Sequence, residues 1–206
     1  HPSVISDAKR RGKNPREILL DISKHYSALR RFKFWWKRGR PDIVHVSLIT
    51  ILDSPLNKKL GIDVILHTVN DEVIRVSPRV RIPRNYERFE GLFSQLLRKG
   101  RVPPKGDPLI WIEGRGIKVL RATLSHYERV VGLSRRGRRV DLEEYLSEGL
   151  RSSPSLAFVV GAFQRGSFSK EVSESFTDLI SVSDLPLSTN AVLCKLTSSL
   201  ESVLGL

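Results

Sequence analysis

Cysteine is nearly absent from the chain, which has only Cys194 among its 206 residues. A single cysteine excludes an intrachain disulfide framework and a four-cysteine zinc site. The five histidines are scattered and show no His-x-x-x-His pairing, so we expect no metal site. The scarcity of cysteine and the lack of a visible secretory signal favour a reducing compartment, and we expect a cytoplasmic protein.

Long apolar runs are missing as well. The longest of them, such as residues 43–52, are interrupted by His and Ser and are too short to span a bilayer. A protein of the membrane surface would need an amphipathic anchor or a lipidation signal. We therefore expect a soluble protein with no membrane partner.

Acidic residues are too few to balance the basic ones. The chain has 35 Lys and Arg against 22 Asp and Glu, which gives a formal charge of +13. Such an excess repels itself unless the usual partner is a polyanion, and nucleic acid is the leading candidate. Residues 1–40 hold much of this excess, because twelve of them are basic and only three are acidic.

Aromatic side chains alternate with cations within residues 30–38, which read RRFKFWWKR. Proteins that bind single-stranded nucleic acid combine aromatic stacking with phosphate contact in this way. We favour RNA contact for this stretch. The alternative is a solvated basic helix whose aromatic side chains dock onto the core.

Apolar residues make up 40% of the chain and are spread along it, which predicts one folded α/β domain over residues 1–206. Within it we distinguish a basic N-terminal segment at 1–40 and a Gly- and Pro-rich insertion around 100–116. The elements predicted in the first half are a helix at 43–52 capped by Asp42, a hairpin with strands at 62–69 and 73–76, a helix from Asn85 to Gly100, and a strand-like stretch at 109–112.

The elements predicted after the insertion alternate between strands and helices. They are strands at 117–120, 129–133 and 156–160, a helix at 142–150 capped by Asp141, and a last helix that begins after Ser188. The continuous apolar run at 156–160 is typical of a strand buried in a parallel sheet. The last helix carries an apolar stripe formed by Val192, Leu196, Leu200 and Val203. We expect this stripe to be buried within one chain, although packing against a second copy fits the same periodicity.

Three turns follow strand ends in the C-terminal half, at residues 132–134, 161–166 and 183–188. Loops beyond the carboxyl ends of strands form the ligand crevice of open α/β sheets, and glycine lets the backbone approach a cofactor. A purine-containing cofactor would fit there, although Gly161 and Gly166 could simply shape a turn. The pattern is neither a dinucleotide-binding fingerprint nor a phosphate loop, which disfavours nicotinamide and ATP chemistry.

Two groups of arginines are candidates for substrate contact. Arg40 and Asp42 flank a proline that fixes the backbone, and the pair could either present the arginine rigidly or brace a helix start. Arg81, Arg84 and Arg88 recur every three or four residues and could bind neighbouring phosphates. A solvated charged surface is the alternative for this second group.

Several motifs together resemble the Nep/Emg family of ribosome-biogenesis methyltransferases, and the chain looks archaeal. The motifs in the first half are Arg40-Pro-Asp-Ile-Val-His45, Leu52-Asp-Ser-Pro-Leu-Asn57, His67-Thr68, Arg81-Ile-Pro-Arg84 and Arg88-Phe89-x-Gly91-Leu92. Those in the second half are Leu133-Ser134, Gly161-Ala162-x-x-Arg165-Gly166 and Ser183-x-x-Pro186-Leu187-Ser188. The match runs from about Ile18 to the C-terminus, and a string of this length is specific.

The resemblance implies a SPOUT-type trefoil-knotted α/β fold, with a parallel sheet flanked by helices and a small β-hairpin and loop extension. It also implies a homodimer that uses S-adenosyl-L-methionine (SAM) to methylate N1 of a pseudouridine in small-subunit rRNA. The residues it assigns to the SAM pocket are Leu133, Ser134, Gly161, Ala162, Gly166, Ser181, Leu185, Leu187 and Ser188. Those it assigns to RNA or the target base are Arg38, Arg40, Arg81, Arg84 and Arg88, with Asp42 and Asp53 in or beside the catalytic site.

For the chemistry, we expect Arg40 to stabilise the anion that forms when the pseudouridine ring loses its N1 proton. Asp42 either accepts that proton or orients Arg40. One alternative is a non-catalytic assembly factor that holds rRNA and retains a cofactor-binding fold. Another is a methyltransferase that acts on plain uridine.

Overall fold

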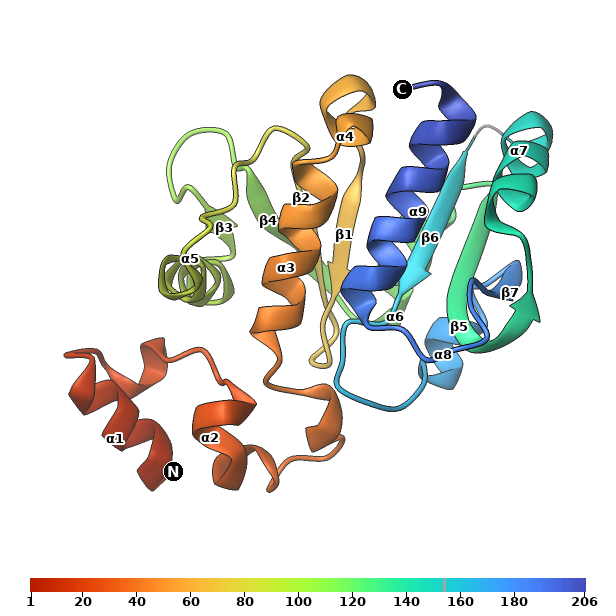
Figure 1. Cartoon of the computed structure of the whole chain (residues 1–206). Helices are drawn as coiled ribbons and strands as arrows, with labels where there is room; N and C mark the ends of the chain where they lie inside the picture. The colour runs from red at the N-terminus through yellow and green to blue at the C-terminus, as the bar shows by residue number, and fades with distance from the viewer. Residues whose placement is uncertain (154) are drawn as a thin grey trace.

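The computed structural model describes residues 1–153 and 155–206, whose strands form a four-stranded antiparallel sheet and a three-stranded parallel sheet (Figure 1). The antiparallel sheet has the order β1 (Val64–His67), β2 (Glu72–Val76), β4 (Ile110–Arg115), β3 (Arg101–Val102). The parallel sheet has the order β6 (Leu156–Val160), β5 (Arg129–Arg139), β7 (Asp178–Ser181). The predicted α/β class with a parallel sheet is therefore confirmed.

Helices cover both faces of the parallel sheet. They are α7 (Leu142–Ser152) and α9 (Thr189–Leu204) on one face, and α6 (Ile117–Leu124) and α8 (Lys170–Ser173) on the other. Side chains alternate between the two faces of a strand. Val131 and Leu133 of β5 therefore pack toward α7 and α9, whereas Val130 packs against α6. This alternation buries β5 on both faces.

The antiparallel sheet packs against α3 (Pro41–Leu52) and α5 (Tyr86–Lys99). The centre of this core consists of Leu48, Ile74, Phe89, Leu96 and Ile110, which are all at most 1% exposed. Burying an apolar side chain of this size contributes about 1.5–3 kcal/mol. The core therefore fixes α3 against the sheet.

Helices α3 and α9 lie side by side and join the two halves of the molecule (Figure 1). The Thr50 hydroxyl donates a 2.6 Å hydrogen bond to the Asn190 side chain. The backbone N–H of Leu56, in α4 (Pro55–Leu60), donates to the Glu201 carboxylate at 3.1 Å. This packing brings the start of α3 next to the loops that follow the parallel strands.

The basic N-terminal segment packs against α5 through buried charges. It comprises α1 (Pro2–Arg10), η1 (Pro15–Glu17), α2 (Ile22–Leu29) and η2 (Trp35–Lys37). Glu90 of α5 is 3% exposed and pairs with Arg11 at 2.9 Å and with Lys24 at 3.4 Å. A buried carboxylate must be paired, so removing either cation would weaken the docking of the segment.

The helix ends predicted from capping residues are confirmed. Asn85 and Gly100 bracket α5, Asp141 caps α7 and Ser188 caps α9. The apolar stripe of α9 packs into the core of the parallel sheet. Strand β6 is parallel as predicted, but its residues are only half-buried because it lies at the edge of the sheet.

Three expectations need correction. Residues 117–120 are the first turns of α6 and not a strand, because apolar residues continue at helical spacing to Leu124. Asp42 does not cap α3: Arg40 occupies the cap position and Pro41 the first helical position, so Asp42 lies in the first turn. Residues 132–134 are not a turn after a strand, because β5 continues through them to Arg139.

The strand-like stretch predicted at 109–112 is found in β4, and with β3 it extends the predicted hairpin into the antiparallel sheet.

Candidate active site

A cavity of about 660 Å³ opens where the middle of β5 and the carboxyl ends of β6 and β7 meet the start of α3. Ligands of open α/β sheets bind in the crevice beyond the carboxyl ends of the strands. The volume lies within the range of about 300–1,000 Å³ that small-molecule sites occupy. This cavity is therefore the candidate active site.

Most of the residues predicted to bind the cofactor line this cavity. They are Leu133, Ser134, Gly161, Gly166, Ser181, Leu185, Leu187 and Ser188. Leu133 and Ser134 lie within β5, and the other six lie at the end of β7 or in the loops after β6 and β7. Of the predicted set, all of which the structure describes, Ala162 alone does not line the cavity. One strand and two loops that are distant in the sequence thus converge on one space.

Two glycines shape the loop at residues 161–168, which we call the cofactor loop. A Cβ atom on Gly161 would lie 2.8 Å from the ring of Phe163, which is closer than real contacts allow. Gly166 has a φ of +114°, which L side chains rarely adopt. The Thr189 hydroxyl donates to the Gly161 carbonyl at 2.7 Å and fixes the start of the loop to α9. These glycines shape the turn, and the turn forms one wall of the cavity.

An apolar wall faces the open space of the cavity. Leu185 is 71% exposed and Leu187 is 38% exposed, although both belong to the lining. Full burial of such a side chain contributes about 1.5–3 kcal/mol, so a flat apolar ligand that covered them would gain affinity. The wall therefore suits the adenine ring of a nucleoside.

The opposite wall carries a rigid ion pair. Arg40 donates from Nε and Nη2 to the two carboxylate oxygens of Asp42, at 2.8 and 2.6 Å. Pro41 fixes the backbone between them. The hydrogen bond to Asp42 raises the pKa of the Arg40 guanidinium. Both oxygens of Asp42 accept from the same guanidinium, so the carboxylate fixes the orientation of Arg40.

Asp53 and Arg84 lie outside the cavity lining, on the neighbouring surface. Arg84 donates to the Asp53 carboxylate at 2.7 Å, and both side chains are exposed. His45 on α3 donates from Nε2 to the Pro83 carbonyl at 2.7 Å, which ties the segment before α5 to α3. The arginines near the start of α5 therefore have a fixed position relative to Arg40.

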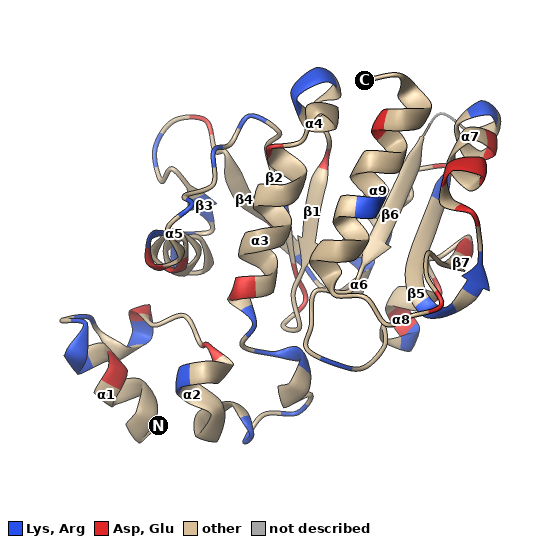
Figure 2. Cartoon of the chain, viewed as in Figure 1, with Lys and Arg blue, Asp and Glu red and all other residues tan. Residues whose placement is uncertain are grey.

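The other predicted RNA-binding residues also lie outside the lining. Arg81 and Arg88 are exposed, whereas Arg38 is half-buried and donates to the Asn70 side chain at 2.7 Å. Figure 2 shows Lys and Arg along the N-terminal segment, up to the start of α3, and again at the end of β5. A polyanion could therefore contact basic residues on more than one side of the cavity.

Sequence reasoning missed several residues that line the cavity. They are Ile43, Val46, Arg135, Phe163, Gln164, Arg165, Ser167, Phe168 and Asn190. A signal existed for Arg165, which lies within a motif that resembles the family. Phe163 and Gln164 lie in the same predicted turn, and Ile43 lies in the motif at residues 40–45. For the remaining residues no local signal was found, because their place in the lining depends on how distant segments meet.

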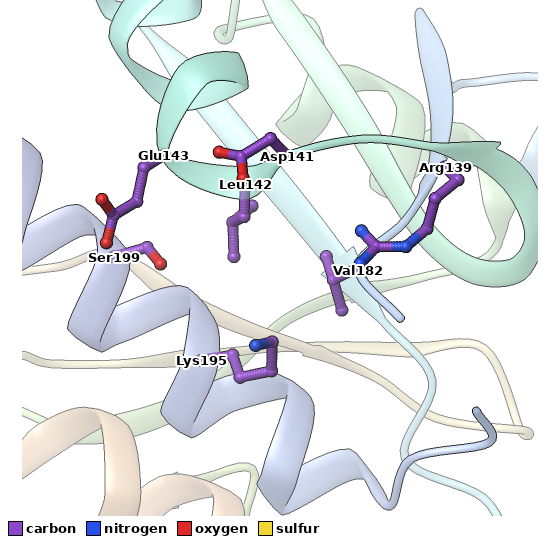
Figure 3. Close-up of a pocket in the computed structure, with 7 residues that line it drawn as sticks. All are labelled: Arg139, Asp141, Leu142, Glu143, Val182, Lys195 and Ser199. Carbon is purple, nitrogen blue, oxygen red and sulfur yellow. The ribbon is translucent and has the colours of Figure 1, made fainter. Parts of the chain in front are cut away.

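A smaller depression of about 180 Å³ lies on the other side of Val182, which lines both spaces. Figure 3 shows its residues: Arg139 at the end of β5, Asp141, Leu142 and Glu143 at the start of α7, and Lys195 and Ser199 on α9. Two cations and two carboxylates balance each other there. Its volume lies below the range of about 300–1,000 Å³ for small-molecule sites, so the larger cavity remains the candidate.

Within residues 1–153 and 155–206, no group of three or more His, Cys, Asp or Glu side chains could hold a metal ion. No helix in this part of the chain combines the length and apolar content that a bilayer crossing requires.

Fold and site together define a class of protein. A crystal structure described as Archaeoglobus fulgidus Nep1 bound to S-adenosylhomocysteine (SAH) matches the chain with a TM-score of 0.85 and 35% sequence identity. The match covers 100% of this chain and 90% of that chain. The protein therefore has the α/β fold of SPOUT-class methyltransferases.

The chain belongs to the EMG1/NEP1 methyltransferase family, whose sequence model matches residues 2–201. The relatives named ribosomal RNA small subunit methyltransferase Nep1 include one from Saccharolobus solfataricus that is 38% identical over 100% of this chain and 89% of its own length. Another, from Pyrobaculum aerophilum, is 40% identical over 100% of this chain and 91% of its own length. The family resemblance inferred from the motifs is thus confirmed.

Proposed function

We propose that this protein is a SAM-dependent methyltransferase that methylates N1 of a pseudouridine in small-subunit rRNA during ribosome biogenesis. The observation that carries the proposal is one cavity with two walls, in which turns and leucines at the strand ends face the Arg40–Asp42 pair. The relatives are named as small-subunit rRNA methyltransferases, and the A. fulgidus protein was solved with SAH. SAH is what SAM becomes when it has given up its methyl group.

The cavity fits SAM both in volume and in the chemistry of its lining. Leu185 and Leu187 would cover the adenine ring, while backbone groups of the loops after β6 and β7 and the hydroxyls of Ser134 and Ser188 would bind the polar parts. The SAM-binding residues in this proposal also include Gly161, Gly166, Leu133 and Ser181. Ala162 supports the turn that follows β6. When bound, SAM supplies an electrophilic methyl group on a sulfonium.

Arg40 stabilises the reacting base in this proposal. N1 of pseudouridine is a poor nucleophile while it bears its proton. When N1 loses this proton, the negative charge spreads onto the carbonyl oxygens of the ring. A guanidinium beside those oxygens stabilises the anion. Asp42 orients Arg40 through two hydrogen bonds, and this geometry favours orientation over proton acceptance. Holding N1 close to the sulfonium lowers the barrier further.

The arginines outside the cavity position the RNA. Arg38, Arg81, Arg84 and Arg88 contact phosphates in this proposal, and Asp53 holds Arg84 in place at 2.7 Å. Because phosphate contacts fix register without reading sequence, the target base would be selected by the cavity.

The whole chain acts as one methyltransferase domain in the cytoplasm, and a homodimer is its working form. Leu60, Leu204 and Leu206 are exposed where α4 and the end of α9 lie together at one end of the molecule (Figure 1). A second copy could bury this apolar surface. Analytical ultracentrifugation of the wild type should show a dimer, and a monomer at micromolar concentration would contradict this part of the proposal.

The proposal can be tested with three transcripts of one archaeal small-subunit rRNA. The first is made with pseudouridine triphosphate in place of UTP, the second with UTP, and the third with N1-methylpseudouridine triphosphate. Transfer of labelled methyl groups from SAM is expected for the first transcript only. Equal transfer to the UTP transcript would indicate a uridine methyltransferase, and transfer to the third would exclude N1 as the acceptor.

The position of the exposed arginines also suits a second function, a non-catalytic assembly factor. Because Arg81, Arg84 and Arg88 lie outside the cavity, RNA could bind without a cofactor. Calorimetry with SAM separates the two functions. Absence of SAM binding with intact RNA affinity would favour the assembly factor.

A further inference from the structure

The aromatic and basic stretch at residues 30–38 contacts the cofactor loop. The Lys37 ammonium donates to the Ser167 carbonyl, which is 130 positions away in the sequence. The same ammonium lies 5.1 Å from the ring centroid of Phe163. The Arg165 guanidinium lies 5.1 Å from the centroid of Trp35. In Figure 1 the loop between β6 and α8 accordingly lies beside the segment that precedes α3.

The backbone of the cofactor loop has little support from within the loop. Over the described residues, no backbone N–H of residues 162–168 donates to a backbone carbonyl. The rings of Phe163 and Phe168 meet edge to face at 6.1 Å, so the internal contact of the loop is made by side chains. Segments with few backbone hydrogen bonds open at low free energy. Contacts from outside the loop therefore contribute to the shape of its backbone, and Lys37 supplies one of them directly. Phe163, Arg165 and Ser167 also line the cavity, so the shape of the loop determines the cofactor site.

Aromatic pairs and a hydrogen bond stabilise the conformation of residues 30–38. The rings of Tyr26 and Trp35 meet edge to face at 5.6 Å, and those of Trp35 and Trp36 at 6.1 Å. Arg38 donates from Nε to the Lys33 carbonyl at 3.1 Å. Edge-to-face aromatic pairs stabilise such a cluster beyond simple burial. The stretch can therefore transmit a change on its outer side to the loop.

The outer side of the stretch is free to meet RNA. Phe32 is 49% exposed and Phe34 is 43% exposed, and the cations Arg30, Arg31 and Lys33 are exposed around them. Lys37 differs from these cations, because it is half-buried and burial lowers the pKa of its ammonium. Phosphates would thus bind the exposed cations and leave Lys37 on the loop.

We propose that residues 30–38 clamp the cofactor loop when rRNA binds, so that rRNA and the cofactor bind cooperatively, with Lys37 as the positioning residue that joins the two. This inference rests on the proposed function, because it takes RNA and SAM as the two ligands. RNA on the outer side orders the stretch, the stretch orders the loop, and the cofactor then binds without having to order the loop itself. By linkage, SAM or SAH tightens RNA binding by the same factor.

The test measures the dissociation constant of SAH by calorimetry, with and without a saturating transcript made with N1-methylpseudouridine. This transcript has no free N1, so no transfer can complicate the titration. For the wild type we expect RNA to tighten SAH binding about tenfold, a typical coupling between two sites. A ratio near one would overturn the clamp.

Matched variants then identify the residue responsible. Lys37→Gln and Lys33→Gln each remove one charge from the stretch and one cation from an aromatic ring, but only Lys37 contacts the cofactor loop. Lys37→Gln should bring the ratio close to one. Lys33→Gln removes one of the exposed cations, so it should weaken RNA binding and keep the wild-type ratio. Lys37→Arg, which retains a donor and a cation, should restore most of the coupling.

Each contrary result is informative. A wild-type ratio in Lys37→Gln, or no recovery in Lys37→Arg, would overturn the role of Lys37. Thermal unfolding identifies a misfolded variant, and Trp35→Leu, which removes the ring beneath Arg165, then serves as the second variant and should also lower the ratio. Methyl transfer to the pseudouridine transcript is measured in parallel. Transfer without coupling contradicts only the clamp, whereas coupling without transfer contradicts only the proposed enzyme.

Discussion

The two walls of the cavity differ in chemistry, because one is mostly uncharged and the other carries an ion pair. The wall formed by the middle of β5 and the loops after β6 and β7 consists of backbone groups, serine hydroxyls and the exposed leucines Leu185 and Leu187. The wall at the start of α3 consists of a guanidinium held by a carboxylate. A nucleoside cofactor needs the first kind of surface, and a base that becomes negatively charged needs the second. Substitutions in one wall should therefore affect either cofactor binding or stabilisation of the charged base, but not both.

The largest effect is expected for Arg40→Ala in the charged wall. Loss of a donor that stabilises a developing anion lowers the rate by about 10²–10³-fold. Single-turnover methyl transfer to the pseudouridine transcript measures this loss, and SAH affinity should hardly change. Arg40→Lys keeps the charge but cannot form both hydrogen bonds to Asp42, so it should lie between the wild type and the alanine variant. Equal losses of transfer and SAH affinity would show that the two walls do not act separately.

The next largest effect concerns the charged docking of the N-terminal segment. Asp7 is buried; it accepts a hydrogen bond from Arg10 at 2.6 Å and forms an ion pair with Arg11 at 3.1 Å. Burial alone would raise the pKa of Asp7, but the hydrogen bond from Arg10 and the charge of Arg11 hold it below its usual range. Asp7→Asn should lower the free energy of unfolding by about 1–3 kcal/mol at neutral pH.

The sign of the pH dependence follows from the lowered pKa of Asp7. The stabilisation is present above the pKa that Asp7 has in the unfolded chain, and it disappears as the pH falls through the lower pKa of the folded state. The difference between wild type and Asp7→Asn in urea unfolding should therefore shrink with acid. Asp107→Asn, which changes an exposed carboxylate, is the matched control. A difference that grew with acid would contradict this assignment.

A smaller effect is expected for Leu185→Asn in the apolar wall. Because Leu185 is 71% exposed, the change should alter stability little. The loss of apolar contact with the cofactor should weaken SAH binding about tenfold, which corresponds to the lower end of the value for burying a leucine. Ile5→Asn changes another exposed apolar side chain, far from the cavity in α1, and should leave SAH binding unchanged. Equal behaviour of the two variants would contradict the apolar wall.

The smallest effect is expected for Arg88→Ala on the surface outside both walls. Losing one phosphate contact should weaken RNA binding uniformly across sequences and reduce the slope of log affinity against log salt by about one. Fluorescence anisotropy at several salt concentrations measures this slope. SAH binding without RNA should stay at the wild-type value. An unchanged slope would place Arg88 outside the RNA contact.

Sequence patterns were sufficient where a local signal determined the structure. The caps at Asn85, Asp141 and Ser188 placed three helices, because a side-chain oxygen that accepts from the first turn is a local requirement. The reading of residues 117–120 as a strand failed because four apolar-rich residues do not distinguish the two periods. The trefoil knot, which depends on the threading order of the chain, has no local signal and stays a prediction from the resemblance.

The candidate site also contains features that local sequence patterns predict and features that depend on contacts between distant segments. The loops at 161–166 and 183–188 could be predicted, since glycine and polar residues after parallel strands mark a ligand crevice. The turn predicted at 132–134 is wrong because β5 continues to Arg139, although Leu133 and Ser134 still line the cavity. The contact between Lys37 and the cofactor loop could not be predicted, because it joins residues 130 positions apart through a side chain and a carbonyl. The role of Asp42 was open in the sequence, and only the two hydrogen bonds from Arg40 favour an orienting role.

The most direct test of the central claim is the identity of the methylated nucleoside. Wild-type protein is incubated with SAM and the pseudouridine transcript, the RNA is digested, and the nucleosides are separated and weighed by mass spectrometry. The account predicts that N1-methylpseudouridine appears, and that Arg40→Ala yields far less of it. A ribose-methylated nucleoside, a product methylated at another ring position, or no new nucleoside in the presence of bound SAM would contradict it.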